Sequence, residues 1–140
     1  MTREEFSLLH INNRDCRILE IAPSFNPMYP RADGWNTEII DYLDTDSLIE
    51  WYKGRSEKIE KVDYVCSRDY AKTVGKKKWY DIVAASHVIE HSIDLIGFLN
   101  DCDQMLSDDG IIKLVIPDKR YICDCFKDIT STRVAVDEYI

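Results

Sequence analysis

The sequence lacks an apolar run long enough to span a bilayer, and it lacks an excess of basic residues. Its 18 Lys and Arg residues stand against 26 Asp and Glu residues, which gives a formal net charge of -8 at pH 7. Because Lys and Arg supply most sequence-independent affinity for phosphates, this charge argues against DNA or RNA as a partner. The first ten residues mix acids and bases and have no signal-like apolar stretch. We therefore expect a cytoplasmic protein without a membrane or nucleic-acid partner.

The sequence also lacks an even set of cysteines. Five cysteines indicate a reducing compartment and not a disulfide framework. Cys123 and Cys125 form a CxC pair that could give two thiolates to a metal ion, but a four-ligand site needs a second pair at suitable spacing, and the sequence has none. We expect no bound metal.

What the chain does have is enough apolar residues for one core, 45% of 140 residues, so residues 1–140 are predicted to form a single domain. Short runs rich in β-branched residues predict five strands. They lie at residues 17–22, 38–42, 62–66, 81–85 and 111–116. The last two are almost wholly apolar without alternation, which is typical of parallel strands covered on both faces.

Two helices are indicated between these strands. One apolar stripe has helical spacing and consists of Leu95, Phe98, Leu99, Cys102, Met105 and Leu106. We expect Ser92 to cap the start of this helix, and the turn sequence 107–110, with its glycine, to end it. Ser47 and Glu50 have the spacing of a capping box, which predicts a shorter helix that ends at Gly54.

The alternation of strands and helices predicts a three-layer, Rossmann-like α/β fold with a mainly parallel sheet of about five strands. In such folds the loops at the carboxyl ends of the strands gather at one edge of the sheet, where ligands bind.

The first predicted strand ends in an acid followed by small residues, at 20–27, where the chain must turn sharply. Small side chains let the backbone approach a nucleotide-type ligand closely. Asp41 ends the second predicted strand, where an acid can accept hydrogen bonds from both ribose hydroxyls. Acids often follow strands, so the spacing from Glu20 to Asp41 fits either a ribose contact or chance. The G-x-G-x-x-G pattern of dinucleotide-binding dehydrogenases is absent, which disfavours NAD.

Three segments resemble the class I S-adenosylmethionine-dependent methyltransferases. RILEIAPSFNP resembles their first motif, IIDYLD their second, and residues 80–121 the segment from their fourth strand through their fifth. The blocks ASHVIEH and PDKRY are most similar to those of a bacterial group often found with glycosyltransferases. The resemblance covers roughly residues 15–133.

The resemblance implies S-adenosylmethionine as cofactor and assigns residues to it. Glu20 would lie near the amino group of the methionine moiety, with Ala22 and Ser24 lining the turn. Asp41 would hold the ribose, and Tyr42 would lie beside the adenine.

Further residues follow from the same resemblance. Cys66, Ser67 and Asp69 would surround the adenine edge, while Ser86 and His87 would face the methionine and the methyl group. This sequence departs from the family in its first motif, where Ala22, Ser24 and Asn26 stand in place of glycines.

His87, Glu90 and His91 are the candidate acid–base residues for catalysis, and residues 118–120 could orient a polar acceptor. The same HVIEH segment matches the H-x-x-E-H pattern of inverted zinc proteases. That reading is disfavoured because the pattern follows directly on a buried strand and has no helical zinc-binding context.

The expected function is methyl transfer to a small molecule or a glycan, and the alternative is a catalytically silent binding or interaction domain. The family usually has seven strands, whereas this chain stops at Ile140 after five, so we expect the last two to be missing, in a chain that is either truncated or minimal. An unpaired fifth strand at the sheet edge would favour a homodimer.

Overall fold

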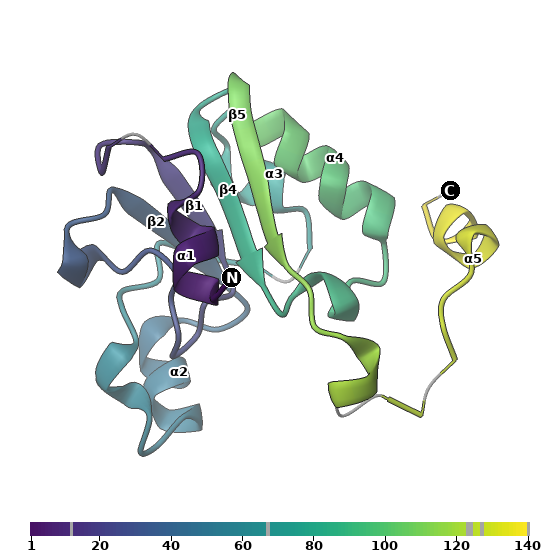
Figure 1. Cartoon of the computed structure of the whole chain (residues 1–140), viewed down its shortest axis with the longest axis horizontal. Coiled ribbons are helices and arrows are strands. Elements are labelled where there is room, and N and C mark those ends of the chain that lie inside the picture. Colours follow the sequence, from purple (N-terminus) through teal and green to yellow (C-terminus); the bar gives the residue numbers. More distant parts are fainter. Residues whose placement is uncertain (12, 67, 123–124, 127, 140) are drawn as a thin grey trace.

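The computed structural model describes residues 1–11, 13–66, 68–122, 125–126 and 128–139. One sheet of five parallel strands, in the order β3-β2-β1-β4-β5, forms its centre (Figure 1). The strands are β1 (Ile18–Ile21), β2 (Thr37–Asp41), β3 (Tyr64–Val65), β4 (Tyr80–Ser86) and β5 (Leu106–Val115). All five predicted strands are present, and the predicted parallel α/β fold is confirmed.

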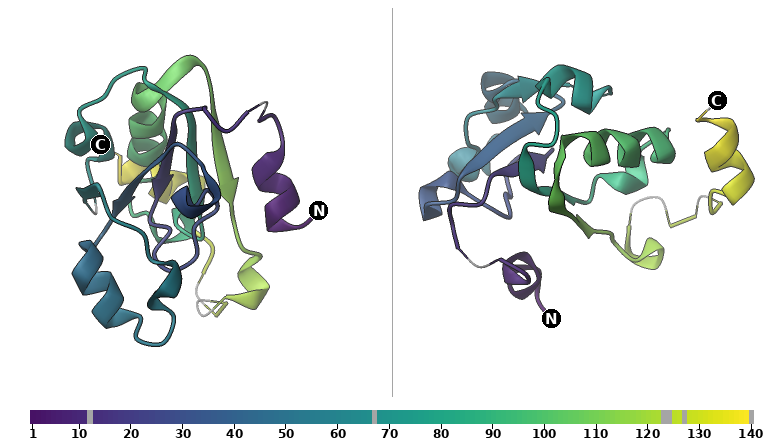
Figure 2. Two further views of the ribbon diagram at one scale, coloured as in Figure 1. Left: turned by 90° about the vertical axis from the view of Figure 1, so that its left-hand side faces the viewer. Right: turned by 90° about the horizontal axis from the view of Figure 1, so that it is seen from above.

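Helices cover both faces of this sheet. The α-helices are α1 (Arg3–Leu8), α2 (Thr45–Trp51), α3 (Tyr70–Val74), α4 (Leu95–Met105) and α5 (Thr132–Asp137). Short 3-10 helices are η1 (Arg31–Asp33), η2 (Ser56–Lys58), η3 (Ile89–His91) and η4 (Lys119–Tyr121). Figure 2 shows α1 on one side of the sheet and α4 on the other, which gives three layers. Within the described ranges, every helix is too short or too polar to cross a bilayer.

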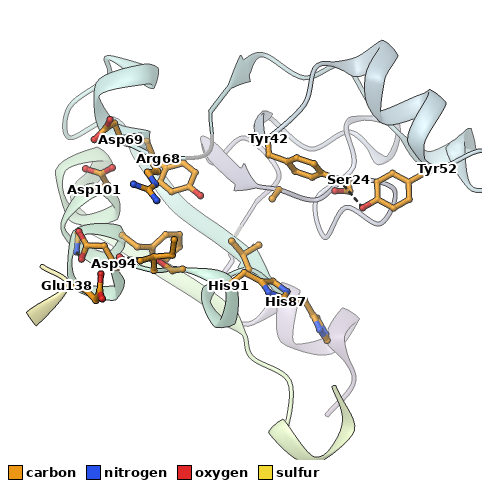
Figure 3. Close-up of a pocket in the computed structure, with 17 residues that line it drawn as sticks. Ser24, Tyr42, Tyr52, Arg68, Asp69, His87, His91, Asp94, Asp101 and Glu138 are labelled. Carbon is orange, nitrogen blue, oxygen red and sulfur yellow. Dashed lines mark hydrogen bonds between the residues drawn. The ribbon is translucent and has the colours of Figure 1, made fainter. Parts of the chain in front are cut away.

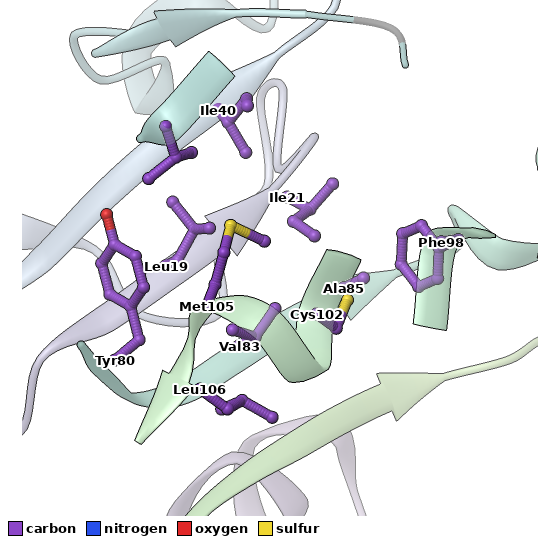
Figure 4. Close-up of a cluster of buried hydrophobic side chains, with 11 residues drawn as sticks. Leu19, Ile21, Ile40, Tyr80, Val83, Ala85, Phe98, Cys102, Met105 and Leu106 are labelled. Carbon is purple, nitrogen blue, oxygen red and sulfur yellow. The ribbon is translucent and has the colours of Figure 1, made fainter. Parts of the chain in front are cut away.

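Strand β1 builds both halves of the core because its side chains alternate between the two faces. Leu19 and Ile21 belong to one apolar cluster with Phe98, Cys102 and Met105 of α4 (Figure 4). The other cluster lies on the face that α1 covers and contains Ile18, Ile82, Ala84, Met28, Tyr29 and Trp35. Glu20 has the same parity along β1 as Ile18, so it is buried on the α1 side of the sheet.

Both predicted helix starts were wrong by two or three residues, because an aspartate and not a serine supplies the cap. Asp44 precedes α2 and accepts a hydrogen bond from the backbone N–H of Ser47, the residue predicted to be the cap. Asp94 precedes α4 and accepts from the N–H of Gly97, while the hydroxyl of Ser92 donates to the carbonyl of Asp94.

The predicted end of α4 also differs. The helix ends at Met105, and the chain enters β5 at once, so residues 107–110 lie inside the strand as an irregularity between the pairs Tyr80↔Leu106 and Ile82↔Ile111. Gly110 therefore does not end the helix. A Cβ at this position would come within 2.9 Å of the carbonyl oxygen of Tyr80, so the close approach of the two strands requires glycine.

Candidate functional site

A cavity of about 760 Å³ opens at the carboxyl ends of the strands. Residues that directly follow three strands line it, which are Ala22 after β1, Tyr42 after β2 and His87 after β4, and Asp69 joins them from the start of α3. Of the predicted site residues, Ser24 and His91 also line it. The cavity therefore lies where the sequence predicted a ligand to bind, at the carboxyl ends of the strands.

Backbone strain is concentrated around this cavity. Ala22 and Ser24 have φ angles of 49°, Asp69 has 54° and His87 has 58°, all in the left-handed region that side chains disfavour. These four are among six non-glycine residues with positive φ in the described chain. Residues held in such conformations cluster at active sites and ligand clamps, so the strain makes this cavity the candidate functional site.

The turn after β1 keeps its shape through hydrogen bonds to β2. The N–H of Ala22 donates to the carbonyl of Ile40 at 2.7 Å, and the N–H of Ser24 donates to Oδ2 of Asp41 at 2.9 Å. Asp41 Oδ1 accepts from the N–H of Tyr42 at 2.8 Å. Burial raises the pKa of Asp41, and these hydrogen bonds oppose the shift. Asp41 thus holds the backbone of the turn through hydrogen bonds from a buried position, and it does not itself line the cavity.

Glu20 also organises the turn, from the α1 side of the sheet. Its two oxygens accept hydrogen bonds from the N–H groups of Met28 and Tyr29, at 2.6 and 3.1 Å. Burial raises the pKa of Glu20 to about 7, although these hydrogen bonds and the charge of Arg3 lower it. The carboxylate is therefore engaged with backbone, outside the cavity lining.

Cys66 and Ser86 lie just below the cavity. The N–H of Cys66 donates to the carbonyl of Asp41 at 2.9 Å, and the hydroxyl of Ser86 accepts from Nε of Arg3 at 3.3 Å. Neither residue lines the cavity. The predicted contact of Ser67 falls outside the described residues.

The predicted acid–base residues His87 and Glu90 lie close to each other. The backbone N–H of His87 donates to the carbonyl of Val115 at 2.9 Å, and its side chain lines the cavity and is 59% exposed. Nδ1 is 3.7 Å from Oε1 of Glu90. Oε2 of Glu90 is buried and has no hydrogen-bond partner among the described atoms. The arrangement is an exposed imidazole backed by a carboxylate that has hydrogen-bonding capacity left.

The two sides of the cavity differ in chemistry (Figure 3). Tyr42 and Tyr52 form one side, with their hydroxyls 3.4 Å apart. The opposite side, which we call the acidic wall, is formed by Asp69, Asp94, Asp101, Glu138 and Arg68. Four carboxylates face one guanidinium there, so the wall carries net negative charge.

The sequence interpretation missed most of the acidic wall. Asp94 caps the start of α4 and Asp101 lies two turns into it, so neither directly follows a strand, and the sequence interpretation looked only at strand ends. Glu138 follows α5 and gave no signal, because only the folded chain brings it to the cavity.

Other candidates lie away from the cavity. Asp118 and Arg120 pair with each other on η4, and Lys119 donates to the carbonyl of Cys125. The zinc pattern falls on a strand end and a 3-10 helix, and across the part of the chain that is described no three His, Cys, Asp or Glu side chains stand together as a metal site would need.

No family model matches this chain, and no curated protein matches it. Solved structures do. The trans-methyltransferase CalH, in complex with SAH, is similar with a TM-score of 0.54 and 20% identity over 79% of this chain and 34% of that chain. A putative sarcosine dimethylglycine methyltransferase from Galdieria sulphuraria is similar with a TM-score of 0.57 and 14% identity over 96% of this chain and 56% of that chain.

A TehB-like SAM-dependent methyltransferase from Corynebacterium glutamicum has a TM-score of 0.55 and 12% identity over 99% of this chain and 72% of that chain. The chain spans about a third of the length of CalH and a little over half of the Galdieria protein. At these identities the likeness concerns the fold. The chain has the fold of the class I S-adenosylmethionine-dependent methyltransferases.

Proposed function

We propose that this chain binds S-adenosylmethionine in the cavity at the strand ends and transfers its methyl group to a small molecule or a glycan. One observation carries the proposal: four strained residues, Ala22, Ser24, Asp69 and His87, line one cavity in a methyltransferase fold. A volume of about 760 Å³ is in the range of small-molecule sites. One of the similar structures was solved with SAH, which supports the same ligand here.

The residues around the cavity fit the parts of this cofactor. Ala22 and Ser24 keep the left-handed backbone of the turn and have small side chains, so a ligand can approach the backbone closely. Tyr42 and Tyr52 offer aromatic surface to a purine ring, and carboxylates of the acidic wall can accept hydrogen bonds from its amino group. Asp41 lies beneath the lining, and its Oδ2 accepts from both the N–H and the hydroxyl of Ser24, so the lone pair left for a ribose hydroxyl is on Oδ1, which accepts only from the N–H of Tyr42 among the described groups.

When bound, S-adenosylmethionine supplies a methyl group on a positively charged sulfur, which becomes a neutral thioether as the acceptor's electron pair forms the new bond to carbon. The chain's contribution is alignment and proton removal. His87 takes the proton that an acceptor hydroxyl loses. Glu90 orients the His87 ring, because its carboxylate lies behind Nδ1.

The acceptor class rests on the resemblance of residues 80–121 to a bacterial methyltransferase group associated with glycosyltransferases. A small molecule or a glycan is consistent with the chain's formal net charge of -8, which disfavours polyanionic substrates.

Isothermal titration with S-adenosylmethionine, SAH and NAD tests the proposal. We expect binding of the first two and none of NAD, and a loss of affinity in Tyr42→Ala. Tyr121→Ala is the matched control, because Tyr121 is 82% exposed and lies outside the cavity lining. Binding of NAD alone, or no binding of any of the three, overturns the proposal. Binding of S-adenosylmethionine without turnover on any hydroxylated acceptor supports the silent binding domain instead.

A further inference from the structure

A second cavity, of about 630 Å³, opens on the α1 side of the sheet, and we call it the α1 cavity. Its lining comes from α1, from residues 26–33 after β1 and from residues 57–60 at η2. Among the described residues, none lines both this cavity and the one at the strand ends. The proposed function places the cofactor in the strand-end cavity and leaves the α1 cavity without an assigned ligand.

Arg3 connects the α1 cavity to the strand end that carries the proposed base. Arg3 and Asn26 both line the α1 cavity, and Nη2 of Arg3 donates to the carbonyl of Asn26 at 2.6 Å. Nε of Arg3 donates to the hydroxyl of Ser86 at 3.3 Å. Ser86 directly precedes His87, whose side chain lines the strand-end cavity on the side away from the acidic wall (Figure 3). His87 therefore lines one cavity and follows a residue that is in contact with the wall of the other.

The α1 cavity combines charged groups of both signs with apolar surface. Its charged side chains are Glu4, Asp33, Glu57 and Glu60, and Arg3 and Lys58. Its apolar side chains include Pro27, Met28, Pro30 and Ile59.

This lining indicates an uncharged ligand that is rich in hydroxyls. A ligand of one charge would satisfy only the groups of opposite sign and would leave the others desolvated without a partner, and a wholly apolar ligand would satisfy none of them. A hydroxyl donates to a carboxylate and accepts from a guanidinium or an ammonium group. The C–H faces of a sugar ring can pack on the apolar side chains. An uncharged sugar therefore fits both parts of the lining.

We infer that the α1 cavity binds the methyl acceptor, and that this acceptor is an uncharged sugar with one hydroxyl directed to His87. The inference rests on the proposed function, because it needs the cofactor in the strand-end cavity. The acceptor oxygen forms a bond to the methyl carbon while the carbon–sulfur bond breaks and its electron pair stays on sulfur. The hydroxyl proton goes to His87. Two separate cavities on either side of one base would thus hold the two substrates in line.

Two methionines on opposite faces of the sheet give the test an internal control. Met28 lines the α1 cavity, and Met105 is buried in the cluster under α4. Their isotope-labelled methyl groups report a bound ligand at each place by NMR. The probes are the methyl glycosides of glucose, galactose and mannose as uncharged sugars, with glucosamine and glucuronate as the cationic and anionic counterparts.

A bulky side chain in the lining should block the α1 cavity. The blocking variant is Ala32→Phe, at an exposed position of the lining. The matched control is Gln104→Phe, at an exposed position of α4 that lines neither cavity. SAH is titrated into each chain in parallel.

We expect an uncharged glycoside to shift the Met28 signal and to leave the Met105 signal in place. Ala32→Phe should raise the Kd for that glycoside by about tenfold or more and slow methyl transfer to it by a similar factor, while the Kd for SAH stays unchanged. Gln104→Phe should change none of these quantities. If Ala32→Phe does not fold, the Met28 shift in the wild-type chain carries the test.

A Met28 signal that no uncharged glycoside moves overturns the inference, and so does a shift with glucosamine or glucuronate alone. Glycoside binding that Ala32→Phe leaves intact also overturns it. A chain that binds SAH and no sugar keeps the proposed function and loses this inference. A chain that binds a sugar and no SAH overturns the proposed function itself.

Discussion

The backbone N–H of Ser24 donates to Oδ2 of Asp41 at 2.9 Å, which ties the turn after β1 to the end of β2. The acid is 1% exposed, and its other oxygen accepts from the N–H of Tyr42. One buried carboxylate therefore fixes the backbone of two segments that line the cavity. Asp41 therefore has a role in shaping the site besides its proposed contact with ribose.

Asp41→Ala should lower both stability and affinity. Each buried N–H left without an acceptor costs about 1 to 3 kcal/mol, so the free energy of unfolding should fall by at least that amount in urea denaturation. Calorimetry should show weaker binding of SAH. Asp44→Ala is the control: it removes the cap of α2, at about 1 kcal/mol, and should leave SAH binding unchanged. Equal affinities in Asp41→Ala and Asp44→Ala would assign no binding role to Asp41.

Ala22→Gly should stabilise the protein. Ala22 has a φ of 49°, a conformation that costs a residue with a Cβ about 1 to 2 kcal/mol and costs glycine much less. Part of this gain is offset by the greater freedom of glycine in the unfolded chain, which leaves a net increase of up to about 1 kcal/mol. The matched control is Ala71→Gly in α3, which should destabilise by about 0.5 to 1 kcal/mol. The melting temperatures of the two variants should move in opposite directions.

The raised pKa of Glu20 should make the free energy of unfolding depend on pH. Its pKa is about 7 in the folded chain against an ordinary value of 4.5, so the folded state holds the proton more tightly. That contribution is fully present below pH 4.5 and is lost as the pH rises through 7, a change of about 3 kcal/mol. Glu20→Gln, which has no charge to titrate, should lose this slope. Parallel stability curves for Glu20→Gln and the wild type from pH 4.5 to 7.5 would contradict the raised pKa.

The strands and the turn after β1 could be predicted because their signals are local. A short apolar run rich in β-branched residues indicates a buried strand without reference to the rest of the chain, and small residues after an acid indicate a sharp turn. The helix starts could not be placed as well, because Asp44 and Ser47, or Asp94 and Ser92, have equal capping propensity and only the folded backbone decides which oxygen reaches the N–H. Helices α1 and α3 have six and five residues and are too short for periodicity to show.

The site was predictable only where residues directly follow strands. His87 and Tyr42 were found in this way, since parallel strands bring their carboxyl ends to one edge, and Asp69 was found in the loop that follows β3. Glu138 comes from the far end of the chain, and no local pattern indicates where such a side chain lies. Glu20 and Asp41 were selected by spacing, but spacing does not tell whether a carboxylate points at a ligand or at a backbone N–H.

Glu90→Met should raise stability and lower activity. Glu90 is 13% exposed, and its Oε2 is buried without a hydrogen-bond partner among the described atoms, a penalty of about 1 to 3 kcal/mol that an apolar side chain of similar length removes. We expect the free energy of unfolding to rise by about 1 kcal/mol. Methyl transfer should slow by about tenfold, because the His87 ring loses the carboxylate 3.7 Å behind its Nδ1.

The control for this prediction is Glu50→Met, at an exposed position of α2 where the carboxylate pairs with Lys53. It should change neither quantity by much, because exposed ion pairs contribute little. SAH affinity should stay the same in both variants, since Glu90 does not line the cavity. Opposite changes in stability and turnover at Glu90 alone indicate a buried acid kept for function at the expense of stability. A fall in stability with unchanged turnover would instead make Glu90 a structural residue and leave His87 without its orienting carboxylate.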